Sequence, residues 1–195
     1  GGGAAGDSIA TLAALLAAET SADALVPVVD PVAAAACHQA ALGEEITLTV
    51  GHALDPRWGK PITITGRIGH LSDGRFTYTG GVWDGLEGKM GPTAVLEIGA
   101  IRLMITSYAT YDWMDEQFQS VGLDANTAKF VVAKNPMNYR QAYGAIAKAV
   151  FVLDTPGPTP PTVRHAPFQR VRRPYFPKDL DIPDLMPTIL APGAA

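Results

Sequence analysis

EITLTVGHALDPRWGKPITITGRIGHLSD, residues 45–73, determines the predicted class of fold. Its two halves, EITLTVG (45–51) and KPITITGRIGHLSD (60–73), alternate apolar with polar side chains and are rich in β-branched residues, as expected for strands with one buried face. Further along, SDGRFTYTG contains an Asp73-Gly74 turn, and TAVLEIGAIRLMITS has Gly99-Ala100 between two apolar runs; both patterns indicate hairpins. The middle third of the chain is therefore predicted to be an antiparallel meander.

Helices and further strands are predicted on both sides of this meander. A helix is expected from about Ile9 to Glu19, capped by Asp7 or Ser8, then a short strand, then a helix that begins at Pro31 with Asp30 as its cap. After the meander, KFVVAK (129–134), NYRQAYGAIAKA (138–149) and VFVLDTPG (150–157) are predicted to form a βαβ-like unit. The fold class is thus α+β: a mixed sheet with an antiparallel meander in the middle, flanking helices and an extended proline-rich C-terminal tail.

Composition narrows the classes of function. The chain has 195 residues, 47% hydrophobic and 17% charged, which is enough to bury a core. Its net charge of -4 argues against nucleic acid as a partner. Because its apolar runs fall short of the roughly 20 residues that span a bilayer and no secretory leader is evident, we expect no membrane partner and a cytoplasmic location.

The sequence offers no convincing metal ligands or nucleophile. His38, His52, His70 and His165 fall in four different predicted elements, and none has the i, i+4 spacing that lays two imidazoles on one helical face. The single cysteine, Cys37, lies among alanines, a setting that raises the pKa of a thiol. We therefore predict neither a metal site nor a catalytic residue within this chain.

Two segments are candidates for binding an anion. GGGAAGDS (1–8) directly precedes a helix, so its backbone N–H groups and the helix dipole suit a phosphate, a carboxylate or a peptide carbonyl; the alternative is a flexible connector. Lys134 and Asn135 end a predicted strand and Arg140 lies in the first turns of the next helix, so the two cations can clamp an anion beyond the strand end. The alternative there is a solvated, salt-bridged helix start.

Five stretches occur in an order that resembles a known family. They are GGGAAGDS, DPRWGKPITITGRIGHLSDGRF, KMGPTAVLEIG, FVVAKNPMNYRQAYGAIAKAVFVLDTPG and VRRPYFP. Together they resemble the C-terminal domain of the MlrC family, the microcystinase C-like metallopeptidases, from Gly1 to about Pro177. The resemblance implies one domain over residues 1–177. Residues 178–195 are not covered by it and are expected to form a flexible tail.

The resemblance also implies a function. In the family pattern Gly1 to Ser8 completes a longer motif, so a larger N-terminal domain is expected before it, holding the catalytic zinc with acidic and histidine side chains. This chain is then the C-terminal domain of a zinc-dependent peptide or amide hydrolase, inactive alone, whose partners are a small peptide or amide substrate and its own N-terminal metal-binding domain. The implied substrate-binding residues are Gly1, Gly2, Gly3, Asp7, Ser8, Lys134, Asn135 and Arg140.

The sequence departs from the family pattern at two places in this set. Lys134-Asn135 stands where the family often has Lys-Ser, and Tyr139 stands where phenylalanine or histidine often precedes the arginine. The alternative function is a non-catalytic module that binds a small molecule or a protein. The coding sequence upstream of Gly1 distinguishes the two: a zinc-ligand domain in frame supports the hydrolase, and a start codon there supports the module.

Overall fold

The computed structural model describes residues 5–112, 114–135 and 137–182. It divides into two compact units, residues 1–159 and 160–195, and each unit is described separately.

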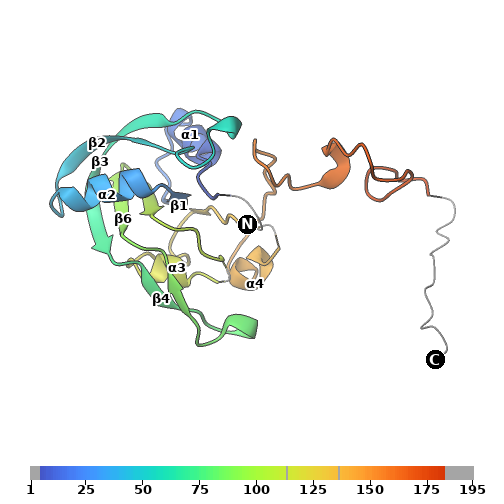
Figure 1. Ribbon diagram of the computed structural model, residues 1–195. Coiled ribbons are helices and arrows are strands. Elements are labelled where there is room, and N and C mark those ends of the chain that lie inside the picture. The colour runs from blue at the N-terminus through green and yellow to red at the C-terminus, as the bar shows by residue number, and fades with distance from the viewer. Residues whose placement is uncertain (1–4, 113, 136, 183–195) are drawn as a thin grey trace, which may run out of the picture. The chain divides into compact units, whose positions relative to one another are not determined.

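A six-stranded mixed sheet organises the first unit (Figure 1). Its spatial order is β2-β3-β6-β7-β1-β8, and the strands in that order are β2 (Glu45–Val50), β3 (Ile62–Ser72), β6 (Thr93–Ile98), β7 (Ile101–Thr106), β1 (Ala24–Val29) and β8 (Phe130–Val131). β2, β3, β6 and β7 pair antiparallel, whereas β1 is parallel to both β7 and β8. The predicted α+β class and mixed sheet are confirmed, as is the β6–β7 hairpin at Gly99.

The period-two pattern of the strands produces a core on each face of the sheet. On β1, Val26 and Val28 face α1 (Ala10–Ala17) and α2 (Pro31–Gln39), while Leu25 faces the other side, where α3 (Glu116–Gln119) lies. Figure 1 shows α2 lying across one face of the strands and α3 on the opposite side. Each fully buried aliphatic side chain contributes about 1.5–3 kcal/mol to this packing.

The start of α2 forms as the sequence predicts. Asp30 is the N-cap: its Oδ1 accepts the Ala33 N–H at 3.0 Å, and Pro31 occupies the first helical turn. Its Oδ2 accepts the Gly51 N–H at 2.9 Å, so one carboxylate, 2% exposed, also ties the helix to the end of β2.

The predicted cap of α1 is wrong. The N-cap is Ile9, and no side chain caps this helix. Asp7 is not available, because its Oδ2 accepts the N–H groups of Leu54 and Asp55 at 3.0 and 2.7 Å.

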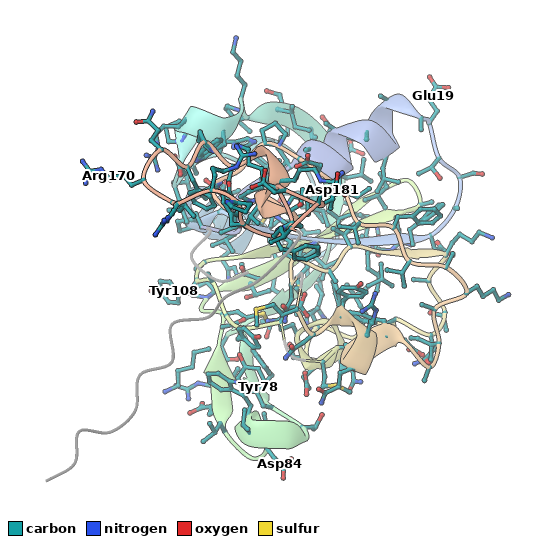
Figure 2. The ribbon with its side chains drawn as sticks, turned by 90° about the vertical axis from the view of Figure 1, so that its right-hand side faces the viewer. Glu19, Tyr78, Asp84, Tyr108, Arg170 and Asp181 are labelled. Carbon is teal, nitrogen blue, oxygen red and sulfur yellow. The ribbon has the colours of Figure 1, made fainter. Side chains whose placement is uncertain are left out.

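The meander contains an excursion that the sequence analysis missed. β3 does not form a hairpin with β4 (Arg75–Thr77), which instead pairs with β5 (Glu87–Lys89) in a separate two-stranded sheet. The chain leaves β3 at Gly74, where φ is +72° and a Cβ would lie 2.1 Å from the Gly91 carbonyl oxygen. Figure 2 shows Tyr78 and Asp84 on this excursion; in the sequence they stand before and after the turn η2 (Gly81–Trp83), which connects β4 to β5.

The predicted βαβ-like unit near the end of the first unit is also wrong. β8 has two residues and α4 (Tyr139–Tyr143) has five, and residues 150–157 are not a strand. Phe151 is 76% exposed and Val152 66% exposed. A β-branched and aromatic run forms a strand only where a neighbouring strand accepts its hydrogen bonds, and this segment has no such neighbour among the described residues.

The second unit is described from residue 160 to 182. It contains the turn η3 (Val163–His165), an Arg173–Asp179 ion pair and a Phe168–Tyr175 ring contact with centroids 6.0 Å apart. The boundaries predicted at 177/178 stay a prediction, and most of the predicted tail, residues 183–195, lies outside the described residues. No helix in the described ranges has both the length and the apolar character that crossing a bilayer requires.

Candidate functional site

The carboxyl ends of the three parallel strands meet at one edge of the sheet. β7, β1 and β8 lie side by side in that order and run in the same direction. In sheets of this kind, ligands bind beyond the carboxyl ends of the strands. A cleft of about 290 Å³ lies at this edge, lined by Val28 and Val29 of β1, Met104 and Thr106 of β7, the following segment 109–112, and Gly6, Pro27, Met90, Gln117 and Lys134.

Among the described residues that line this cleft, Lys134 is the one with a cationic side chain. Its Nζ donates to the carbonyl oxygens of Gly6 and Ser8, both at 2.6 Å, and its backbone N–H donates to Asp112 Oδ2 at 3.2 Å. Burial lowers the pKa of the Lys134 ammonium to about 8, and the charge of Asp7 opposes this shift. An ammonium has three donors, so one remains for a ligand in the cleft.

Asp112 is the acidic group of the cleft, and the sequence analysis missed it. Asp112 is 9% exposed, and burial raises the pKa of its carboxyl to about 6. The hydrogen bond from the Lys134 N–H lowers this pKa and so opposes part of the shift. It lies in the segment that follows β7 (Figure 2, where Tyr108 of the same segment points outward). An acidic residue between aromatic ones, shortly after a buried strand, was the available signal (YDW, 111–113).

Asn135 is buried, and its side chain stabilises the loop before α4. Its Nδ2 donates to the Asp112 carbonyl oxygen, and its Oδ1 accepts the N–H groups of Met137 and Asn138 at 3.0 and 3.3 Å. Together with the bond from the Lys134 N–H to Asp112, the Nδ2 bond holds the segment after β8 against the Asp112 segment. Its predicted contact with substrate stays a prediction.

Arg140, on α4, is exposed, and its guanidinium lies over the Tyr139 ring, 5.3 Å from the centroid. Lys134 contributes to the described lining of the cleft and Arg140 does not. The structure thus places the two predicted cations differently: one is held inside by carbonyl oxygens, the other is solvated.

The predicted glycine loop is described only from Ala5 onward; Gly1, Gly2 and Gly3 lie outside the described residues. Gly6, the nearest described glycine, has φ +81°, and a Cβ there would come within 2.7 Å of Val29 Cγ2. Its carbonyl oxygen accepts both Lys134 Nζ and the Val29 N–H, the latter at 3.1 Å. Only glycine fits this close passage of the loop over the end of β1 without strain.

Asp7 and Ser8 fix the loop at the edge of the cleft, Asp7 through its carboxylate and carbonyl oxygen and Ser8 through its carbonyl oxygen. Asp7 is 5% exposed and its carboxylate holds the loop after β2, while its carbonyl oxygen accepts the His52 N–H at 2.9 Å. Ser8 gives its carbonyl oxygen to Lys134. The segment Gly6–Ser8 is therefore fixed from both sides.

The described residues hold no group of three or more histidine, cysteine, aspartate or glutamate side chains that could bind a metal ion. His38 Nε2 lies 3.0 Å from the Thr93 carbonyl oxygen, and His70 lies within β3. Cys37 is buried, and burial raises the pKa of its thiol to about 11, in line with the apolar setting seen in the sequence.

Comparison with known proteins assigns the chain to a family. The family model described as "MlrC C-terminus" matches residues 1–170, and the chain belongs to this family. It is 22% identical over 180 residues to microcystinase C of Sphingomonas sp., a match that covers 91% of this chain and 33% of that protein. It is also similar to the crystal structure of a candidate metallopeptidase from Mesorhizobium sp. BNC1, with a TM-score of 0.76 and 28% identity over 90% of this chain and 35% of that one. The chain thus spans about a third of the length of both relatives.

Proposed function

We propose that this chain is the C-terminal domain of a zinc-dependent peptide or amide hydrolase and that it supplies substrate-orienting groups to a site whose metal lies in an N-terminal domain. The observation that carries the proposal is the cleft at the carboxyl ends of β7, β1 and β8, with Lys134 and Asp112 in its wall, in a chain of the MlrC C-terminus family. The names of the two relatives, a microcystinase and a candidate metallopeptidase, support the same reaction class.

The chemistry of the cleft matches an amide. Lys134 has a remaining N–H that donates to a substrate carbonyl or carboxylate, and the Asp112 carboxylate accepts a substrate N–H. Thr106, Thr110 and Gln117 add polar groups to apolar walls, which suits a small peptide. The N–H groups of Gly2 and Gly3 and the guanidinium of Arg140 complete the proposed substrate-binding set, with Asp7, Ser8 and Asn135 holding the loops that carry it.

The described residues do not fit zinc, because they bring no three suitable ligands together. In this proposal the chemistry of the metal belongs to the N-terminal domain. The contribution of this chain is to bind and orient the substrate. Losing one orienting contact lowers the rate of hydrolysis without removing the chemistry.

The test compares this chain with a protein in which it is joined to the family's N-terminal domain. We expect the longer protein to bind zinc and to hydrolyse short peptides. Hydrolysis should stop when zinc is chelated and return when zinc is added back. This chain alone should neither bind zinc nor hydrolyse peptides. Arg140→Ala in the longer protein should lower kcat/KM while leaving the thermal midpoint unchanged, because the side chain is exposed. Hydrolysis that survives chelation refutes the zinc assignment, and unchanged kcat/KM refutes the role of Arg140.

A further inference from the structure

Residues 150–153 (VFVL) form an apolar run that lies largely uncovered on the first unit. The exposed fractions are 48% for Val150, 76% for Phe151, 66% for Val152 and 54% for Leu153. Neighbouring side chains of an extended chain point to opposite sides. Because Phe151 and Val152 are neighbours and both are exposed, neither side of the run is packed against the unit here. Apolar side chains that gather on a surface in this way mark an interaction site.

The backbone of this run is as free as its side chains. In the part of the chain that the structure describes, no backbone–backbone hydrogen bond reaches residues 150–153. Valine and phenylalanine favour strands, and a run that is apolar at every position is typical of a strand buried on both faces of a sheet. The exposed charges of Lys148 and Asp154 bound the run, whose length is ordinary for a strand.

Neither the sheet of the first unit nor a second copy of the chain provides a good place for this strand. The outer strands of the sheet are β2 and β8, and the run pairs with neither. Two copies of the run would pair as a two-stranded ribbon whose faces stay exposed, and such ribbons are marginally stable. The partner must therefore cover both faces of the run, as the sheet of another domain does.

The family relationship and the position of the run indicate which domain this is. The family model matches residues 1–170, so the run lies inside the family's C-terminal domain, and the chain covers only 33% and 35% of its two relatives. Pro156, shortly after the run, lines one hollow together with Ser8 and Ile9. The run thus ends beside the segment at which, in the proposed function, the N-terminal domain joins this chain.

We propose that residues 150–153 form a strand in the sheet of the N-terminal domain. The neighbouring strands of that sheet bond to the N–H and carbonyl groups of the run, and Phe151 and Val152 pack on its opposite faces. The inference rests on the N-terminal domain of the proposed function and adds where, and by which mode, this chain binds that domain.

Amide hydrogen exchange compares this chain with the longer protein in which it follows the N-terminal domain. In this chain the amides of residues 150–153 should exchange almost as fast as in an unstructured peptide, because they lack backbone hydrogen bonds. In the longer protein they should exchange at least about 100-fold more slowly. The turn η2, where Val82 is 83% exposed, is the internal control and should exchange at the same rate in both proteins.

Substitutions on the two sides of the run test whether both are buried. Phe151→Asp and Val152→Asp should each raise exchange at residues 150–153 of the longer protein at least about tenfold, because each buries a charge. Both should leave the thermal midpoint of this chain unchanged, since both side chains are exposed in it. Val82→Asp is the matched control and should change neither protein. If a variant does not fold, the exchange comparison of the parent proteins still decides.

Three results would overturn the proposal. The first is fast exchange of residues 150–153 in a folded longer protein. The second is an effect at only one of Phe151 and Val152, because the run would then lie flat on a surface. The third is a dimer of this chain that Phe151→Asp dissociates, because the partner would then be a second copy. Protection without zinc-dependent hydrolysis would refute the proposed function and leave this inference standing, whereas hydrolysis without protection would refute this inference alone.

Discussion

Replacing Lys134 with methionine should change how stability depends on pH. The pKa of Lys134 falls from 10.5 to about 8 through burial, so below pH 8 the folded state carries a buried ammonium at a cost. Between pH 8 and 10.5 the folded state loses this proton while the unfolded state keeps it, so stability rises with pH; above 10.5 both states are neutral and the cost is gone. A difference of 2.5 pKa units, 10.5 less 8, corresponds to about 3 kcal/mol.

The variant removes this cost together with two hydrogen bonds. The Gly6 carbonyl oxygen keeps its bond from the Val29 N–H, so the loss falls mainly on Ser8, at about 1–3 kcal/mol. These terms nearly cancel at pH 7, so Lys134→Met should unfold within about 2 kcal/mol of the parent chain there.

Urea unfolding at pH 7, 8, 9 and 10 measures the effect. The parent chain should gain stability relative to Lys134→Met across this range, reaching most of the 3 kcal/mol by about pH 10. Lys129→Met, at an exposed lysine, is the control and should run parallel to the parent. Parallel curves for the parent and Lys134→Met would refute the argument that a charged lysine is buried at this cleft.

Three further predictions follow from buried groups and close contacts. Burial raises the pKa of Asp112 from 3.8 to about 6, so between these values the folded state binds a proton that the unfolded state has lost. The contribution of Asp112 to stability should therefore fall by about 2 kcal/mol as pH rises from 4 to 6; Asp112→Asn should flatten this slope in urea unfolding, and an unchanged slope would contradict the assignment. Gly6→Ala should destabilise the chain by at least about 1 kcal/mol more than Gly43→Ala, since both have positive φ but only Gly6 meets a side chain (Val29 Cγ2); equal thermal midpoints would show that the contact relaxes freely. Cys37, buried and with its thiol pKa raised to about 11, should react with a thiol reagent in urea but hardly at all in buffer, and rapid native labelling would show that α2 opens easily.

Local chemistry made part of the fold predictable. Asp30 and Pro31 specify the start of α2 through a cap and a fixed φ, and alternating side chains specify β2, β3, β6 and β7. These features depend on residues that are close in sequence or on a face that must be buried. The order of residues alone is therefore enough to predict them.

The remaining elements depend on partners that are distant in sequence. Gly74 has the sequence of a hairpin turn, yet the Met90 N–H donates to its carbonyl oxygen and the chain leaves the main sheet. Residues 150–157 have the composition of a strand but no strand beside them in the described structure.

The candidate site was predictable only through strand order. Lys134 was found because it follows a strand, and the parallel pairing of β8 with β1 puts it at the expected edge. Asp112 was missed because its importance comes from burial and from the Lys134 N–H, 22 residues away in sequence, and neither is visible locally.

The most direct test of the central claim is kcat/KM for peptide hydrolysis by the longer protein carrying Lys134→Met, compared with Lys129→Met. If the cleft orients the substrate, removing its ammonium should lower kcat/KM by roughly 30- to 900-fold, or about 2–4 kcal/mol, while the exposed control keeps the parent value. Thermal midpoints measured on the same samples identify any loss that is due to unfolding. A folded Lys134→Met protein with the parent's kcat/KM would contradict the claim that this cleft holds the substrate.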